Sequence, residues 1–344
     1  MLIGLCGGMC SGKSSIADYL VIQHGFQRLY LKSSTLTEVT SDNSEPSTVK
    51  PEYAFDNSDD LLFFVTKRWR DKWVTTNIHN HNILDQFLRR PFFILISVDA
   101  PVCLRWDRWK ARQQQNSEKG LTLEEFLAKS DQHLYGSGSD SGQSLISRAT
   151  VRLLNTSSSL AQLYATLGKL DLKNEDRLRP NWDQYFMQLA SLAAQRSNCM
   201  KRRVGCVLVR EKRVISTGYN GTPRGLKNCG DGGCPRCNEG QHSGIGLGTC
   251  LCIHAEENAL LEAGRERIRE GSILYCDTCP CLTCSIKITQ VGISEVVYSQ
   301  SYSMDEETAD VFKEAGIKFR RFVPPPGGTI RLEELSCVQT LHRV

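Results

Sequence analysis

The chain has 344 residues, a formal net charge of +4 at neutral pH and 23% charged residues. The length predicts two domains rather than one core, and the mild charge excludes the strongly basic footprint of a nucleic-acid-binding protein. The longest apolar run, residues 92–98, is too short to span a bilayer. We therefore expect no nucleic-acid partner and no membrane association.

Fifteen cysteines indicate the cellular compartment, because eleven of them fall between Cys199 and Cys284. The first residues, Met1-Leu-Ile-Gly, lead into a glycine loop and do not resemble a signal peptide. Clustered cysteines without a secretory signal favour metal binding in a reducing compartment over a disulfide framework. We expect a cytoplasmic protein, with the nucleus as a further location.

A phosphate-binding loop is predicted at the N-terminus. Residues 7–14 fit the pattern G-x-x-x-x-G-K-S between an apolar strand and a helical run. The loop, with Gly7 and Gly12, presents N–H groups to phosphates, Lys13 reaches the terminal ones, and the Ser14 hydroxyl binds Mg²⁺. We expect ATP or GTP there; a chance match is the alternative that this strand-loop-helix context disfavours.

The segment that follows predicts an α/β domain with a parallel sheet over residues 1–170. A buried strand (residues 92–98) runs into Asp99-Ala-Pro, and three arginines share one helical face. This order resembles the small P-loop kinases of nucleotides and dephospho-coenzyme A. Those kinases carry an acidic residue on a middle strand, whereas residues 72–76 here end in threonines. Kinase turnover and a non-catalytic nucleotide-binding role therefore both stay open.

A charged, polar linker (residues 171–181) precedes a second domain (residues 182–322), and a tail without a predicted role follows (residues 323–344). The apolar spacing in the second domain predicts the order α-β-β-α-β-α-β-α-β. That order corresponds to a five-strand mixed sheet with helices on both faces. The expected helices are residues 182–193, 256–263, 281–289 and 305–315, and the expected strands are residues 204–209, 214–217, 272–276, 295–299 and 317–322.

The two motifs His254-Ala-Glu256 and Pro-Cys281-Leu-Thr-Cys284 carry the predicted chemistry. One imidazole and two thiolates leave the fourth position of a tetrahedral zinc ion open, which is typical of a catalytic site. Glu256 lies close enough to act on a water there without binding the metal. The arrangement matches the known signature of zinc nucleobase deaminases. A structural zinc and metal-free core thiols are the alternatives, and Cys279 is a competing ligand.

These motifs resemble the cytidine deaminase superfamily and, more narrowly, the deoxycytidylate deaminase family in its fungal form with an N-terminal extension. The narrower resemblance rests on residues 218–225 (GYNGTPRG), 254–259, 292–298 and 315–317, and covers about residues 180–322. It implies an α/β/α sandwich and zinc-dependent hydrolysis of dCMP to dUMP and ammonia, which supplies thymidylate synthesis. It also implies a homohexamer activated by dCTP with Mg²⁺ and inhibited by dTTP.

The resemblance assigns roles to further residues. Glu256 becomes the proton shuttle, Asn220 contacts the nucleotide sugar, and the segment Gly218, Tyr219, Asn220 and Gly221 belongs to the effector site. Phage-type members hold a second, structural zinc on cysteines that match Cys199 and Cys229. We therefore expect a second zinc on those two and on two of Cys234, Cys237, Cys250 and Cys252; free thiols are the alternative.

The substrate phosphate requires cations, and the candidates are Arg202, Arg203 and Arg224, because arginine favours bidentate phosphate contacts. A solvated charge run is the alternative. Three other functions compete with dCMP deamination. They are deamination of cytidine or tRNA, a P-loop kinase whose C-terminal domain only binds nucleotide, and a zinc-organised scaffold, which leaves Glu256 unexplained.

Overall fold

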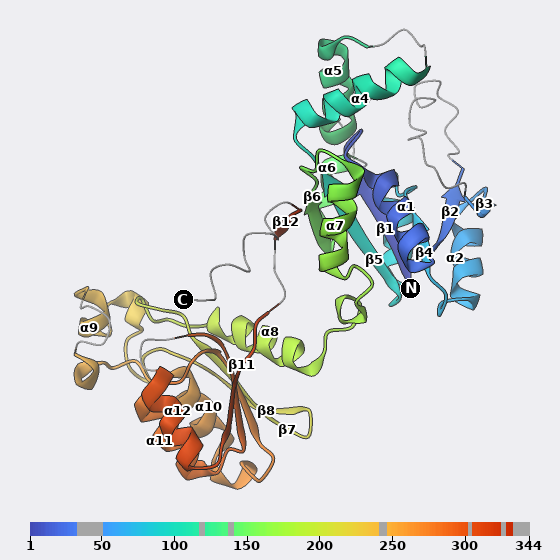
Figure 1. Cartoon of the computed structure of the whole chain (residues 1–344). Helices are drawn as coiled ribbons and strands as arrows, with labels where there is room; N and C mark the ends of the chain where they lie inside the picture. The colour runs from blue at the N-terminus through green and yellow to red at the C-terminus, as the bar shows by residue number, and fades with distance from the viewer. Residues whose placement is uncertain are drawn as a thin grey trace. The chain divides into compact units, whose positions relative to one another are not determined.

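The structure, a computed structural model, describes residues 1–32, 51–116, 121–136, 141–240, 246–301, 305–324 and 328–332. The chain divides into two units, one formed by Met1–Arg179 with Pro326–Val344 and the other by Pro180–Pro325 (Figure 1). Among the described residues, no helix combines the length and the apolar character needed to cross a membrane.

The first unit is built on a seven-stranded sheet of order β12-β6-β5-β1-β4-β2-β3 in which every strand pair is parallel. Parallel sheets need helices on both faces. Strand β1 has this two-sided burial, because Ile3 and Leu5 face one apolar cluster and Leu2 and Cys6 the other. The strands are β1 (Leu2–Gly7), β2 (Gln27–Leu31), β3 (Tyr53–Phe55), β4 (Trp73–Thr75), β5 (Phe93–Asp99), β6 (Val151–Leu154) and β12 (Thr329–Arg331).

Five of the described helices of the first unit contribute to those two faces, and α4 and α5 pack in a separate cluster with Cys10. Helices α1 and α7 contribute to the cluster around Ile3, and α2, α3 and α6 contribute to the cluster around Leu2. The sequence assigned no role to the tail (residues 323–344), and within it Ile330 of β12 is buried in the first of these clusters. The helices are α1 (Lys13–His24), α2 (Ser58–Lys67), α3 (His81–Leu88), α4 (Val102–Asn116), α5 (Leu123–Tyr135), α6 (Gly142–Ser147) and α7 (Leu160–Leu170), with the 3-10 turn η2 (Glu175–Arg177).

The second unit contains a five-stranded sheet of order β11-β10-β9-β7-β8. Strand β7 is antiparallel to β8 and β9, whereas β9, β10 and β11 are parallel to one another. The predicted α/β class, with a parallel sheet and a mixed sheet, is confirmed. The strands are β7 (Gly205–Arg210), β8 (Arg213–Tyr219), β9 (Ile273–Thr278), β10 (Glu295–Gln300) and β11 (Lys318–Arg321).

Helices lie on both faces of this mixed sheet, as Figure 1 shows. Alternation along β7 sends Cys206 and Leu208 toward α10, α11 and α12, and sends Val207 and Val209 toward α8. The helices and turns are α8 (Trp182–Ala194), η3 (Cys229–Asp231), α9 (Pro235–Asn238), η4 (Leu247–Thr249), α10 (Ala255–Ala263), η5 (Arg265–Arg267), α11 (Leu282–Val291) and α12 (Asp305–Glu314).

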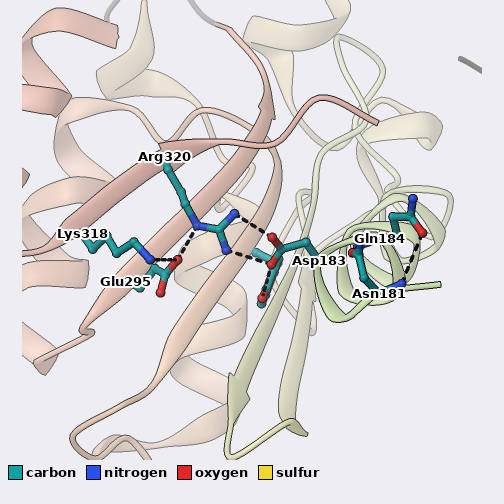
Figure 2. Close-up of polar contacts among 7 residues, drawn as sticks. Asn181, Asp183, Gln184, Glu295, Lys318 and Arg320 are labelled. Carbon is teal, nitrogen blue, oxygen red and sulfur yellow. Dashed lines mark hydrogen bonds and ion pairs between the residues drawn. The ribbon is translucent and has the colours of Figure 1, made fainter. Parts of the chain in front are cut away.

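A polar network ties α8 to the edge of the sheet (Figure 2). Arg320 of β11 donates from Nη1 and Nη2 to the Asp183 carboxylate at 2.7 and 2.8 Å. The same guanidinium pairs with Glu295 of β10, and the Tyr275 hydroxyl donates to Asp183 at 2.8 Å. The first turn of α8 is therefore joined to three neighbouring strands.

Candidate active site and metal centre

Two helix N-termini carry the predicted zinc ligands. His254 is the N-cap residue of α10 and Cys281 is the N-cap residue of α11, and neither side chain caps its own helix. The first N–H groups of a helix lack intrahelical partners and its dipole favours negative charge there. These positions therefore favour thiolates, and they leave both side chains free to point at a common centre.

The three predicted ligand atoms converge in the structure. Cys281 Sγ lies 3.2 Å and Cys284 Sγ lies 3.3 Å from Nδ1 of His254. All three atoms lie within 4.8 Å of one another. Hydrogen bonding from the Cys284 thiol, followed by contact with His254, lowers the pKa of Cys281 to about 3. The group thus has the geometry and the thiolate character of a metal site.

Glu256 lies beside these ligands on the first turn of α10. Its side chain is buried, with 4% of its surface exposed, and its Oε2 is 3.8 Å from Cys284 Sγ. Burial chiefly raises the pKa of the Glu256 carboxyl to about 7. A pKa near neutrality suits a group that both takes and gives a proton. A cation on the adjacent ligands favours the ionised form of this carboxyl.

The donor set fits zinc. Two thiolates and one imidazole match the ligand chemistry of Zn²⁺, and three protein ligands leave one tetrahedral position for water. Cys279, the competing ligand in the sequence, is buried and its thiol donates to the Pro280 carbonyl at 3.6 Å. It does not belong to the group formed by His254, Cys281 and Cys284.

Comparison with known proteins agrees with this chemistry. The profile described as "Cytidine and deoxycytidylate deaminase zinc-binding region" matches residues 180–300. A deoxycytidylate deaminase of Schizosaccharomyces pombe is 50% identical over 323 residues, which span 94% of this chain and 98% of that relative. The deoxycytidylate deaminase of Saccharomyces cerevisiae is 50% identical over 278 residues, 78% of this chain and 86% of the relative.

The chain belongs to the deoxycytidylate deaminase family. The resemblance predicted from the motifs is thereby confirmed at the level of the family. Among solved structures, the dCMP deaminase of cyanophage S-TIM5 in complex with dCMP and dUMP is 30% identical, covering 42% of this chain and 98% of its own, with a TM-score of 0.35.

The residue that the family resemblance assigns to the nucleotide sugar, Asn220, makes three hydrogen bonds through its side-chain amide. Its Oδ1 accepts from the Val204 N–H at 2.8 Å and from the Ser197 hydroxyl at 2.7 Å. Its Nδ2 donates to the Arg202 carbonyl at 2.7 Å. In this structure Asn220 therefore holds the segment that precedes β7, which carries two of the predicted phosphate ligands, Arg202 and Arg203.

The predicted phosphate-binding arginines are all exposed. Arg202 Nη2 contacts Gln300 Oε1 at 3.3 Å, and Arg203 and Arg224 are exposed at the surface. The structure does not gather these three side chains around one point through any of the described contacts.

In the predicted effector segment, Gly218 and Tyr219 have a packing role. A Cβ on Gly218 would lie 2.0 Å from the Ala255 carbonyl oxygen and 2.4 Å from the Ala259 nitrogen. Strand β8 thus passes against the backbone of α10 at a distance that only glycine permits. The Tyr219 carbonyl accepts a bond from Asn258 Nδ2 at 2.8 Å, which fixes the same two elements. A Cβ on Gly221 would also be too close, 2.4 Å from Asn198 Oδ1.

All six cysteines of the predicted second zinc site lie together. The structure groups them into two overlapping sets of four rather than selecting one set. They form a separate cluster of sulfur atoms in the second unit, composed of Cys199, Cys229, Cys234, Cys237, Cys250 and Cys252.

The predicted phosphate loop connects β1 to α1 in the first unit. Gly7 and Gly12 have φ angles of 143° and 104°, which favour glycine. Lys13 Nζ donates to the carbonyl of Gly8 at 2.8 Å and to that of Gly7 at 3.3 Å. Ser14 lies on the first turn of α1. The loop therefore has the strand-turn-helix context that its sequence predicts.

One residue near the zinc ligands was missed by sequence reasoning. Asp277 is 7% exposed at the end of β9, and burial chiefly raises the pKa of its carboxyl. Its Oδ1 has no hydrogen-bond partner among the described residues. The only sequence signal was an acidic residue between a buried strand and the Pro-Cys motif, and that signal is weak without the fold.

Proposed function

We propose that the second unit catalyses the zinc-dependent hydrolysis of dCMP to dUMP and ammonia. The observation that carries this function is the buried Glu256 carboxyl beside the convergent His254, Cys281 and Cys284. The 50% identity to deoxycytidylate deaminases over 94% of this chain supports dCMP as the substrate. The product dUMP is the precursor that a thymidylate-forming methylation requires.

His254, Cys281 and Cys284 would hold a zinc ion, which would supply Lewis-acid activation of a water molecule at neutral pH. The Glu256 carboxylate takes one proton from this water and delivers it to N3 of the cytosine ring, which makes C4 more electrophilic. The water oxygen bonds to C4. Glu256 then moves the second proton of the water to the amino group, the C4–N4 bond breaks, and dUMP and ammonia form.

The substrate phosphate is assigned to Arg202, Arg203 and Arg224, and the sugar to Asn220. Asn220 supports this assignment through the Arg202 backbone, because a fixed loop presents neighbouring guanidinium groups with less loss of conformational entropy on binding. Arginine at these positions favours bidentate contact with a phosphate.

Regulation is proposed to occur through dCTP with Mg²⁺ as activator and dTTP as inhibitor, at the segment from Gly218 to Gly221. Direct contact of this segment with α10 supports that proposal, since α10 begins at the catalytic residues. Family resemblance also motivates a homohexamer and a cytoplasmic or nuclear location. For the first unit we propose ATP or GTP binding at Gly7, Gly12, Lys13 and Ser14, with or without phosphoryl transfer.

The test measures ammonia release by the full-length protein from dCMP, from cytidine and from a tRNA anticodon stem-loop in parallel. We expect turnover of dCMP, faster with dCTP and slower with dTTP, and little turnover of the other two. Preferred turnover of cytidine or of the stem-loop would assign the chain to a different substrate. Equal rates with and without the triphosphates would remove the regulatory part alone.

A further inference from the structure

Six cysteines outside the proposed active site form two interpenetrating groups. Each group contains four Sγ atoms that all lie within 4.8 Å of one another, and two cysteines belong to both groups. One group is Cys199, Cys229, Cys237 and Cys252, and the other is Cys234, Cys237, Cys250 and Cys252. The shared pair is therefore Cys237 and Cys252.

The sulfur–sulfur distances match the edges of a zinc tetrahedron. With Zn–S bonds of about 2.3 Å, two ligands of a regular tetrahedron lie roughly 3.8 Å apart. Cys237 Sγ lies 3.8 Å from both Cys199 Sγ and Cys250 Sγ. Cys234 Sγ is 3.9 Å from Cys250 Sγ, and the shared pair is 4.0 Å apart. A disulfide would need about 2.05 Å, and all six thiols are free.

We propose that these six cysteines bind two zinc ions as one binuclear cluster, in which the sulfurs of Cys237 and Cys252 bridge the two ions. Each zinc ion takes four thiolates, so two ions need eight ligand positions. Six sulfurs fill eight positions only when two of them bind both ions. The shared pair meets this requirement, and a single zinc ion would leave two of the six cysteines without a metal.

Several hydrogen-bond donors around the cluster point at sulfurs that belong to one group only. The N–H groups of Met200 and Leu251 lie 3.4 Å from the sulfurs of Cys229 and Cys234, respectively. The buried Arg236 guanidinium donates to Cys250 Sγ at 3.6 Å and also interacts with the shared Cys237. A terminal thiolate keeps more negative charge than one that is shared by two cations. Donors at the terminal sulfurs therefore fit the bridged arrangement.

The spacing favours zinc over an iron–sulfur cluster. Sets of four thiolates suit both metals. In an iron–sulfur cluster, inorganic sulfide fills part of each iron's coordination, so cysteines on different irons lie farther apart than one tetrahedral edge. Here all four sulfurs of each group lie within 4.8 Å of one another, which leaves room for a single ion at the centre of each.

The cluster also explains how this part of the chain folds. Between β8 and α10 the described residues form only short turns, η3, α9 and η4, and the cysteines make up their buried core. A structural metal supplies folding free energy where apolar burial is small. Cys252 precedes Ile253, whose N–H and C=O pair with Gly221 at 2.9 and 3.2 Å. The cluster therefore fixes the bridged segment that leads directly into His254.

The test counts zinc by mass spectrometry in a full-length Cys281→Ser/Cys284→Ser variant, which retains only one of the three proposed catalytic ligands. We expect two zinc ions per chain, and three in the unaltered protein. One ion in the variant would indicate a single-metal site and overturn the proposal, as would none, or iron with inorganic sulfide. Because the count concerns only the cluster, it is independent of whether the chain deaminates dCMP.

Further variants in the same background identify the groups. Cys234→Ser/Cys250→Ser and Cys199→Ser/Cys229→Ser should each retain one zinc ion, and the exposed Cys103→Ser is the matched control that retains two. If these variants fail to fold, ¹¹³Cd NMR of the otherwise unaltered chain decides. If Cys237 and Cys252 bridge the two cadmium ions, the spectrum should show two cluster resonances, each split by coupling to the other cadmium ion. Resonances without this splitting would overturn the bridge.

Discussion

Glu256 is the residue on which the proposed chemistry depends most directly. It belongs to the same helical turn as His254, yet its carboxylate oxygen is 3.8 Å from the nearest recorded ligand sulfur rather than part of the ligand group. Acid–base function and metal binding can therefore be separated by substitution.

Replacing Glu256 with Gln should lower the rate of dCMP deamination by about 10²–10⁴-fold while the zinc content stays unchanged, because the amide cannot carry the proton. Steady-state kinetics and metal analysis on the same preparation measure both effects. The matched control is Glu257→Gln, whose carboxylate pairs with Lys287 at 2.8 Å. A zinc-loaded Glu256→Gln protein with normal turnover would contradict the assigned role.

Gly218 contributes through its missing side chain. A Cβ there would lie 2.0 Å from a backbone oxygen of α10, so the helix must move or β8 must bend. Overpacking of this kind costs roughly 1–3 kcal/mol or more. Because His254 is the N-cap residue of α10, the displacement reaches the proposed zinc ligands.

Gly218→Ala should therefore lower both the thermal midpoint of the second unit and the rate of dCMP turnover. Differential scanning calorimetry and kinetics at a fixed temperature test this prediction. The control is Gly248→Ala, because a Cβ at that exposed position meets no atom within 4 Å. Equal losses in both variants would refute the packing explanation.

At the scale of elements, α8 is held on the sheet by apolar contact and by the Arg320–Asp183 pair (Figure 2). The Arg320 hydrogen bonds chiefly lower the pKa of Asp183. Because the folded pKa lies below the unfolded value, the pair's stabilising contribution is complete above the unfolded pKa. It is lost as the pH falls through the folded pKa.

Asp183→Asn should thus destabilise the second unit at pH 7 by about 1 kcal/mol, after allowance for solvent screening of a partly exposed pair. The difference from the unaltered protein should shrink below about pH 4, the ordinary range of an aspartate. Urea unfolding at several pH values measures it. Asp310→Asn removes an exposed carboxylate of the same unit as a control. A difference that does not depend on pH would exclude the ion pair as the cause.

Prediction of individual elements from the sequence succeeded where the repeating pattern of apolar residues extended over many positions. Helix α8 and the strands of the mixed sheet were expected within a few residues of their observed bounds. Helix α6 (Gly142–Ser147) was not expected, because it starts inside a Ser/Gly-rich segment and has a single buried apolar residue, Leu145. One buried side chain leaves no periodicity to detect.

At the scale of the whole molecule, the two units carry separate candidate sites. The first unit has its own parallel sheet and the phosphate loop, and it also includes β12, which pairs with β6 through residues 329–331. The C-terminal segment that follows the second unit thus returns to the first sheet. Nucleotide binding in the first unit is therefore testable only in a chain that keeps both ends.

Lys13→Ala should weaken binding of ATP or GTP by the full-length protein about 10–100-fold, because it removes a charge-assisted contact to phosphate worth roughly 1.5–3 kcal/mol. Equilibrium titration with a fluorescent analogue of each nucleotide provides the measurement. Lys169→Ala, an exposed lysine of the same unit, is the control. Unchanged affinity in Lys13→Ala, or no binding by the unaltered chain, would remove the first unit's proposed role.

The sequence by itself determined the α/β class, the family and the residues proposed for the zinc chemistry. It could do so because His254, Glu256, Cys281 and Cys284 lie in two short motifs whose spacing places them on first helical turns. Spacing between residues that are close in the chain can be read directly from the sequence.

Only the tertiary structure decided which distant residues share a centre. It joined six cysteines, spread from Cys199 to Cys252, into two groups with a common pair. In the structure the Asn220 amide accepts a hydrogen bond from a residue 16 positions earlier. Strand β12 pairs within the sheet of the first unit. Such contacts depend on how whole elements pack against one another, and packing between elements leaves no periodic signal in the chain itself.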